Sequence, residues 1–340
     1  MNNEMTNTSR NKLSISVIIP THNRSALLCV AIESFINQDY PNDKYEIIIV
    51  DNASTDNTMQ AVSKFLNSTE PKIRYIYNNK LGLHYSRNQG ATEANNEILY
   101  FADDDVIADK NMLTEICVPF LFNEKVASVT GRVLPKWETP PPKWIERYCN
   151  NKLLSLLDPP EDFVISKNIN FIYGCHQAVK RDVYIMAGGS NPDTFGPIML
   201  GDGEAGLNRK IQTLGYMFGY NGKAITYHVI PLQRMTQKYL DQRIGNEGTS
   251  QAYSDYRKYG PSILSIIFIL TKTTFIYVPF IFLVNIFNIL RYKDFNVSRF
   301  FVANTFYYKN NIKYCFRLLH NRKLRKYTQE SDWIKNSNNH

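Results

Sequence analysis

Three consecutive carboxylates stand at the end of an apolar run in this chain. Asp103, Asp104 and Asp105 directly follow the strand-like segment 97–102. Carboxylates crowded at the end of a buried strand repel one another, and their desolvation is costly unless a cation lies among them. Mg²⁺ and Mn²⁺ prefer oxygen ligands of this kind and commonly bind phosphate groups as well. The residues therefore indicate a divalent-cation site. The alternative is a solvated acidic turn that caps a helix before Lys110.

Further polar residues follow two other strand-like segments. They are Thr21, His22 and Asn23 after residues 14–20, and Asp51 and Asn52 after residues 45–50. Ligands of open α/β sheets bind at the carboxyl ends of the strands, so these residues are expected beside the three aspartates. Any one of them could instead form a turn or cap a helix, but the three sets together favour a binding site.

A regular alternation of strands and helices must position these residues. Apolar segments at 14–20, 45–50, 73–77 and 97–102 alternate with segments of helical periodicity. This order predicts an α/β fold with a mostly parallel sheet flanked by helices. No glycine-rich dinucleotide fingerprint or Walker loop follows the first strand, which disfavours Rossmann dehydrogenases and P-loop enzymes.

A second acidic pair precedes another helical pattern. Asp202 and Glu204 stand just before Leu207, Ile211 and Leu214, which recur at helical spacing. The pair could belong to an exposed acidic loop. It could equally be a helix N-terminus that acidic side chains stabilise.

Several segments share their order and spacing with a known family. They are residues 16–24, 48–56 and 82–90, the aspartates 103–105, and the glycines Gly174, Gly188 and Gly189. Together they resemble the family 2 glycosyltransferases, from about Ile15 to His228. The resemblance implies a GT-A type nucleotide-diphospho-sugar transferase fold. It also implies transfer of a sugar from a UDP-, GDP- or dTDP-sugar, with inversion at the anomeric carbon.

The resemblance also implies roles for individual residues. Donor binding is implied for Pro20, Thr21, His22, Asn23, Asp51, Asn52, Arg87, Asp103 and Asp104, with Asp51 on the base. Binding of Mn²⁺ or Mg²⁺ is implied for Asp105, together with Asp103 and His228. The family commonly has Glu-Asp at the catalytic base. Here, counting back from Gly215-Tyr216 puts Glu204 at that position, and Asp202 is the alternative.

The last third of the chain differs in character. Residues 262–290 are strongly apolar, and residues 291–326 hold ten Lys and Arg against one acid, Asp294. Three interpretations compete: a pair of helices packed on the catalytic domain, an interfacial or re-entrant hairpin on an anionic leaflet, and a single membrane span. Nucleic-acid binding is disfavoured because no nucleic-acid module accompanies the basic residues.

These observations predict the organisation of the chain. We expect a disordered N-terminus at 1–12 and a GT-A domain at 13–250, with a nucleotide-binding half at 13–133 and an acceptor half at 134–250. A helical apolar and basic region at 260–327 and a tail at 328–340 follow. The five scattered cysteines predict reduced thiols and a cytoplasmic location. The apolar and basic region adds a peripheral position at the inner face of the cell membrane, with a single span as the alternative.

The predicted function is metal-dependent inverting transfer of a sugar to a glycan or lipid-linked acceptor, in bacterial cell-surface polysaccharide synthesis. One alternative is a nucleotidyltransferase that makes the activated sugar. Such enzymes usually open with a glycine-rich loop bearing Arg and Lys, unlike residues 20–23. The other alternative is a catalytically inactive nucleotide-binding protein.

Overall fold

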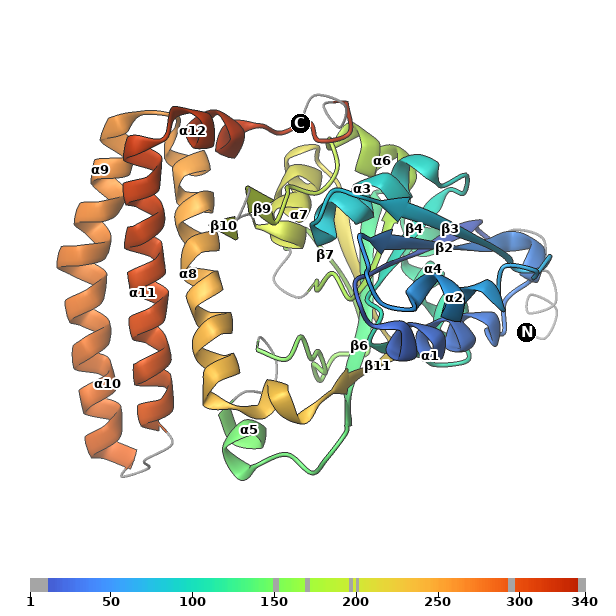
Figure 1. The fold of residues 1–340 in the computed structure, drawn as a ribbon, viewed down its shortest axis with the longest axis horizontal. Helices are drawn as coiled ribbons and strands as arrows, with labels where there is room; N and C mark the ends of the chain where they lie inside the picture. The colour runs from blue at the N-terminus through green and yellow to red at the C-terminus, as the bar shows by residue number, and fades with distance from the viewer. Residues whose placement is uncertain are drawn as a thin grey trace.

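The computed structural model describes residues 12–148, 153–168, 172–195, 198–199, 202–292 and 297–335. They form an α/β domain and a layer of long helices beside it (Figure 1). The predicted disordered N-terminus lies, apart from Lys12, outside the described residues, as does the end of the predicted tail.

The first half of the α/β domain is a parallel sheet. Its strands are β1 (Ile15–Thr21), β2 (Tyr45–Asn52), β3 (Lys72–Asn78) and β4 (Ile98–Ala102), in the order β3-β2-β1-β4. β1 and β2 are buried along their whole length because helices cover the sheet. The connections carry α1 (Ser25–Ile36), α2 (Thr58–Ser63) and α3 (Leu83–Glu93). The parallel arrangement predicted for these four strands is confirmed.

The second half of the domain extends the same sheet with mixed directions. β8 (His176–Lys180) runs antiparallel to both β4 and β6 (Val126–Trp137). β6 then pairs in parallel with the long β11 (Met217–Ile230), whose other partners, β5 (Val106–Ala108) and β7 (Phe163–Ser166), are antiparallel to it. The whole sheet is therefore mixed, and the mostly parallel pattern holds for its first half.

Short elements surround this second half. The helices are α4 (Met112–Phe122), α5 (Lys143–Tyr148), α6 (Arg181–Met186) and α7 (Gly203–Thr213). A small hairpin of β9 (Thr194–Phe195) and β10 (Ile198–Met199) lies between α6 and α7 in the chain.

The helical layer begins with α8 (Gln237–Tyr259), which follows β11 through a short 3-10 turn at Leu232–Met235. α9 (Ile263–Lys272), a π-helical segment (Thr273–Tyr277) and α10 (Val278–Tyr292) form one continuous helix, and α11 (Val297–His320) and α12 (Arg322–Gln329) complete the layer. α8 lies nearest the sheet, α11 packs against it, and the α9–α10 helix is outermost (Figure 1).

The α9–α10 helix buries several polar side chains and exposes many large apolar ones. Ser265, Thr273 and Asn285 are buried, whereas Leu264 and Phe275 are more than 70% exposed. Among the described residues, Ile263–Arg291 is the one helix long and apolar enough to cross a membrane by length and composition.

Candidate active site

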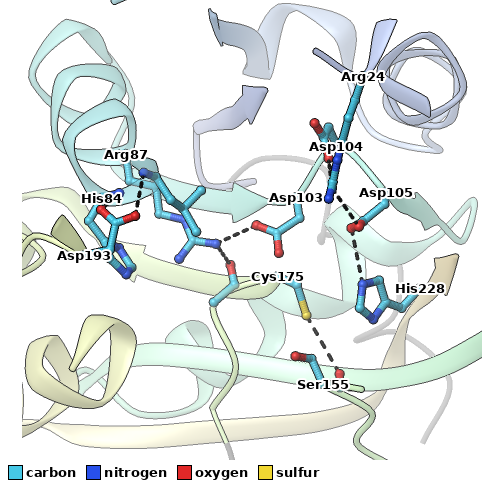
Figure 2. Close-up of polar contacts among 12 residues, drawn as sticks. Arg24, His84, Arg87, Asp103, Asp104, Asp105, Ser155, Cys175, Asp193 and His228 are labelled. Carbon is cyan, nitrogen blue, oxygen red and sulfur yellow. Dashed lines mark hydrogen bonds and ion pairs between the residues drawn. The ribbon is translucent and has the colours of Figure 1, made fainter. Parts of the chain in front are cut away.

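The three aspartates turn toward different partners after β4 ends (Figure 2). Asp103 Oδ1 lies 2.6 Å from a guanidinium nitrogen of Arg87, which also donates to the Gly174 carbonyl at 2.8 Å. A Cβ atom at Gly174 would lie 2.3 Å from Arg87, so this position needs glycine for the arginine to approach. Arg87 is buried on α3 and holds Asp103 at the edge of a cavity.

Asp104 and Asp105 share a second arginine. Arg24 Nη1 donates to Asp104 Oδ1 at 2.9 Å and to Asp105 Oδ2 at 3.1 Å. The Thr21 hydroxyl, at the end of β1, donates to Asp104 Oδ2 at 2.8 Å. Burial raises the pKa of Asp104 to about 6 against the opposing effect of Arg24. Asp104 and Asp105 are only 5% and 4% exposed, so the alternative of a solvated acidic turn is wrong.

Asp105 also meets two residues from the other half of the domain. Antiparallel pairing of β11 with β5 sets His228 opposite Val106, and His228 Nε2 lies 3.3 Å from Asp105 Oδ1. Arg234, on the turn after β11, donates to His228 Nε2 at 2.8 Å and to Asp105 Oδ2 at 2.6 Å. Burial tends to raise the pKa of Asp105, but the charges of Arg234 and Arg24 oppose it, and that pKa lies well below its ordinary value.

Asp105 and His228 are the two side chains of this cluster that could hold a divalent cation. His228 Nδ1 lies 2.8 Å from the Leu154 carbonyl, which only accepts, so Nδ1 carries the hydrogen and Nε2 keeps a lone pair in the neutral ring. Asp105 Oδ1 is buried and accepts no hydrogen bond within the described part of the chain. Asp105 and His228 thus come together as predicted, whereas Asp103 faces Arg87. No group of three close His, Cys, Asp or Glu side chains is found in the described residues.

The predicted nucleoside-side residues gather at the same edge of the sheet. Asp51 is buried at the end of β2, where its Oδ1 accepts from the Ser54 amide at 2.8 Å and its other oxygen accepts from the Tyr75 hydroxyl. Asn52 accepts from the Gly82 amide at 2.8 Å, which fixes the start of α3 beside β2. Pro20 is buried within β1.

The loop after β1 is exposed and braced against β2. His22 Nδ1 donates to the Asn52 carbonyl at 2.7 Å. Asn23 has a φ of 53°, which asparagine tolerates better than most residues, and its side chain accepts from the Thr55 amide at 2.7 Å. His22 and Asn23 are therefore exposed at the carboxyl edge of the sheet.

A cavity of about 450 Å³ lies between this edge and the helical layer. Its lining includes Asp103, Arg87, His228 and Arg234, together with Asp202, Glu204 and several α8 residues. α7 begins at Gly203, so Asp202 and Glu204 stand at a helix N-terminus, the second of the two interpretations, and they also line the cavity.

The two acidic candidates differ in how they are bound. Asp202 accepts from Asn191 at 2.7 Å, from Ser254 at 3.3 Å and from Arg209, and its side chain is 5% exposed. Among the described residues no other side chain is hydrogen-bonded to the Glu204 carboxylate, which accepts from its own backbone amide. Burial tends to raise the pKa of Glu204, but the charges of Arg87 and His84 outweigh it and leave that pKa below its ordinary value. Glu204 is therefore an ionised carboxylate at the cavity that no other side chain engages in a hydrogen bond.

One face of α8 forms the far wall of the cavity. Arg243, Asn246, Glu247 and Ser250 line it at helical spacing, while Gly245, Gly248 and Ala252 of the same helix are buried. The side chains of Asn246 and Ser250 have no hydrogen-bond partner in the part of the chain that the structure describes. They leave donors and acceptors free toward the cavity.

Two residues of this site had no predicted role. Arg24 follows the polar residues after β1, and its position beside a cluster of acids could have suggested a counter-charge. Arg234 lies 129 residues from Asp105, and no local pattern connects the two. Only the pairing of β11 with β5 brings Arg234 to the aspartates.

Solved structures of similar fold were found at low sequence identity. A mannosyltransferase from Pyrobaculum calidifontis, in complex with GDP-Man and Mn²⁺, superimposes with a TM-score of 0.55 at 21% identity, covering 71% of this chain and 63% of that one. GalNAc-T7 with UDP, GalNAc and Mn²⁺ gives a TM-score of 0.51 at 16% identity, covering 70% and 48%. These likenesses confirm the predicted GT-A type fold.

Curated relatives match shorter segments. The poly(ribitol-phosphate) beta-N-acetylglucosaminyltransferase TarS of Staphylococcus aureus is 30% identical over 131 residues, 36% of this chain and 23% of the relative. The GalNAc(5)-diNAcBac-PP-undecaprenol beta-1,3-glucosyltransferase of Campylobacter jejuni is 40% identical over 93 residues, 27% and 29% of the two chains. The matches thus span less than a third of either relative.

The family model described as "Glycosyl transferase family 2" matches residues 16–186. This range contains β1 through α6, with all three aspartates and the arginine that binds Asp103. The match covers half of the 340 residues. The chain therefore belongs to glycosyl transferase family 2.

Proposed function

We propose that this protein transfers a sugar from a nucleotide-diphosphate donor to an acceptor hydroxyl, with inversion and with help from a divalent cation. The observation that carries the proposal is the cavity that Asp103, Arg87 and His228 line together with the carboxylate of Glu204. The relatives are glycosyltransferases by name, and the structures of similar fold hold nucleotide sugars or nucleotides with Mn²⁺. Both facts support this reaction over a nucleotidyltransferase.

Glu204 acts as the general base. Inverting transfer is a single displacement in which an acceptor hydroxyl attacks the anomeric carbon, and the hydroxyl must lose its proton to a positioned group. Glu204 is available to accept that proton because no other side chain is hydrogen-bonded to it among the described residues, and the charges of Arg87 and His84 keep its pKa below the ordinary value. Asp202 is held by Arg209, Asn191 and Ser254 and instead links α7 to α8.

The aspartates hold the donor. A bound Mn²⁺ or Mg²⁺ would stabilise the charge that develops on the leaving diphosphate, and Asp105 with His228 would hold it. Arg87 keeps Asp103 at the cavity edge, and Thr21 keeps Asp104 in place from the neighbouring strand. Asp51 and the exposed His22 and Asn23 lie at the same edge, where the nucleoside binds.

A donor screen combined with two variants tests the reaction. UDP-, GDP- and dTDP-sugars are incubated with the full-length protein and Mn²⁺, and release of the nucleoside diphosphate is measured. Glu204→Gln should bind the donor as the wild type does and lose turnover by about 10²–10⁴-fold, because it lacks the base. Asp202→Asn keeps the shape of its side chain and should retain most of the turnover.

Two results contradict the assignment. If no sugar nucleotide is turned over by the wild type, the protein is not a transferase of these donors. If Asp202→Asn loses turnover while Glu204→Gln retains it, the base is Asp202. Thermal stabilisation by the nucleotide shows in both variants whether the donor still binds.

The acceptor lies along α8. Asn246 and Ser250 offer unpaired polar groups, and Arg243 is paired with Glu247 at 3.4 Å, so the wall is polar and nearly neutral. Such a surface suits the hydroxyl groups of a glycan. The acceptor of the Campylobacter relative is lipid-linked by name, which supports a glycan or lipid-linked acceptor for this protein too.

The helical layer lies on an anionic membrane surface with the α9–α10 helix in the plane of the leaflet. Its outer face exposes Leu264, Phe275 and Leu283, among other large apolar side chains, along the whole length of the helix. A lipid surface covers such a face, and the polar seam of Ser265, Thr273 and Asn285 packs inward.

A crossing orientation is disfavoured by the neighbouring helices. α11 packs alongside the α9–α10 helix and carries the exposed Lys309 and Lys313 in its middle. If the α9–α10 helix crossed the bilayer, these lysines would enter the hydrocarbon at about 2.5–3.5 kcal/mol each. The in-plane orientation keeps both lysines near the headgroups.

A further inference from the structure

The three carboxylates of the aspartate cluster are matched by three guanidinium groups. Arg87 pairs with Asp103 at 2.6 Å, Arg24 pairs with Asp104 and Asp105, and Arg234 pairs with Asp105 at 2.6 Å. Asp104 and Asp105 are buried, and Arg234 has a side chain only 18% exposed. The cluster therefore has its negative charge balanced by side chains of the chain itself.

Within this cluster, Arg234 is hydrogen-bonded to both His228 and Asp105. Its Nη1 donates to the lone pair of His228 Nε2 at 2.8 Å, and its Nη2 donates to Asp105 Oδ2 at 2.6 Å. These two side chains are the ones whose unprotonated atoms fit a divalent cation. One planar guanidinium thus bridges both of the best cation ligands.

We propose that Arg234 is a resident counter-ion that excludes a divalent cation from Asp105 and His228 until a nucleoside diphosphate arrives. The inference rests on the proposed donor class. A divalent cation added alone would give a balanced, largely buried cluster an excess of two positive charges, which a low-dielectric site opposes. A diphosphate group supplies the matching negative charge, so the cation and the diphosphate enter together.

The location of Arg234 allows this exchange. The residue lies on the short 3-10 turn between β11 and α8, and it lines the cavity. Released from Asp105, its guanidinium can turn into the cavity and bind phosphate oxygens, for which arginine is well suited. Arg24 and Arg87 stay on the remaining aspartates.

Binding of Mn²⁺ to the full-length protein tests the proposal without an activity assay. Free Mn²⁺ is followed by electron paramagnetic resonance, first with Mn²⁺ alone and then with UDP, GDP or dTDP added. The wild type should bind Mn²⁺ alone weakly and at least about tenfold more tightly with the best nucleotide, a ratio that measures the coupling. Arg234→Gln should bind Mn²⁺ alone at least about tenfold more tightly than the wild type, and its ratio should fall toward one.

A matched variant and a second substitution make the result decisive. Arg132→Gln removes an arginine that pairs with Asp158 outside the cavity, and its Mn²⁺ binding should equal that of the wild type. Arg234→Lys keeps the charge but lacks the planar guanidinium that binds two partners at once. Its affinity for Mn²⁺ alone should therefore lie between that of the wild type and that of Arg234→Gln. This variant serves if circular dichroism shows that Arg234→Gln is unfolded.

Three outcomes would overturn the proposal. They are equal affinity of the wild type and the Arg234 variants for Mn²⁺ alone, wild-type binding that is as tight without nucleotide as with it, and no Mn²⁺ uptake under any condition. Donor turnover, measured in parallel with and without a chelator, distinguishes a failure of the proposed sugar transfer from a failure of the proposed role of Arg234. If turnover persists in any of these cases, sugar transfer stands and the role of Arg234 falls.

Discussion

His176 is a histidine that its surroundings keep uncharged. It is fully buried in β8, where Nε2 donates to the Ala224 carbonyl at 3.0 Å and Nδ1 accepts from the Tyr100 hydroxyl at 2.5 Å. A Cβ atom at Gly131 would lie 2.6 Å from Nε2, so the neighbouring strand leaves room for the ring. Burial lowers the pKa of His176 to about 4.

This shift predicts a loss of stability in acid. The unfolded chain takes up a proton at the ordinary pKa of about 6.5, whereas the folded protein resists it until about pH 4. Protonation therefore favours unfolding, and the free energy of unfolding should fall as the pH drops from about 6.5 to 4. From pH 7.5 to pH 5, His176 should contribute a loss of about 2 kcal/mol.

Urea unfolding of the wild type and of His176→Gln at both pH values checks this prediction. The variant should be less stable at pH 7.5, and the difference between the two proteins should narrow at pH 5. A difference that stays constant would show that His176 is not the titrating group. Asp104 cannot imitate this result, because its raised pKa acts in the opposite direction and is common to both proteins.

Residues of the site could be predicted from the sequence where they directly follow an apolar strand. Asp103–Asp105, Thr21 and Asp51 follow apolar runs, and the edge of a parallel sheet gathers such residues. The spacing from Gly215-Tyr216 already favoured Glu204 over Asp202. The sequence could not show that Arg209 and Ser254 engage Asp202. Arg234 was missed for a similar reason, since its contact arises from a distant strand pairing.

Among the elements, α8 and α11 pack unusually closely. A Cβ atom at Gly248 would lie 2.0 Å from the Tyr307 carbonyl oxygen, and the Gly248 carbonyl accepts from Asn311 at 3.1 Å. Asn311 also accepts from the Thr273 hydroxyl at 3.2 Å, so one buried network joins α8, α11 and the π-helical segment. Glycine at 248 therefore sets the distance between these two helices.

Gly248→Ala should loosen the helical layer. The added methyl group meets backbone rather than a flexible side chain, and overpacking of this kind costs about 1–3 kcal/mol. Hydrogen exchange followed by mass spectrometry should show faster exchange in α8 and α11 and little change in β1–β4. Gln242→Ala, at an exposed position of the same helix, should leave the exchange pattern unaltered. Equal protection of α8 in both variants would contradict the close packing.

The elements also show what periodicity can predict. β1–β4 and their helices were predicted because each strand is a continuous apolar run and the alternation allows few topologies. The antiparallel insertion of β8 between β4 and β6 was not predicted, because it joins segments that are far apart in the chain. The helical region was predicted from composition, but its inward polar seam depends on which face meets α11.

For the whole molecule, charge is distributed very unevenly. Residues 1–259 hold 27 Lys and Arg against 28 Asp and Glu, whereas residues 260–340 hold 12 against 3. The positive excess of the chain therefore belongs to the part that contains the exposed apolar helix. An anionic leaflet is attracted to such a region, and salt weakens that attraction.

Vesicle flotation tests the membrane surface. The wild type should float with phosphatidylglycerol-containing vesicles, bind less at high salt, and bind pure phosphatidylcholine vesicles more weakly. Phe275→Ser combined with Leu283→Ser should lose most of the binding, because both side chains are more than 60% exposed on the α9–α10 helix. Phe122→Ser, an equally exposed site on α4, should bind as the wild type does.

The same vesicles report the orientation of the helix. Spin labels at positions 264, 275 and 290 should lie at similar shallow depths if the helix is in the plane of the leaflet. A middle label much deeper than the two end labels would indicate a crossing helix. If the wild type stays in solution with vesicles of every composition, the proposal that the helical layer binds a membrane is wrong.

The uneven charge gives the protein a large permanent dipole moment, with its positive pole in the helices behind α8. An anionic bilayer exerts a torque on such a dipole within a Debye length of about 8 Å at physiological salt. The molecule would thus be oriented before it contacts the lipid. The helical layer would face the bilayer, and the carboxyl edge of the sheet would not contact it. Fewer orientations would then have to be sampled before the protein binds the membrane.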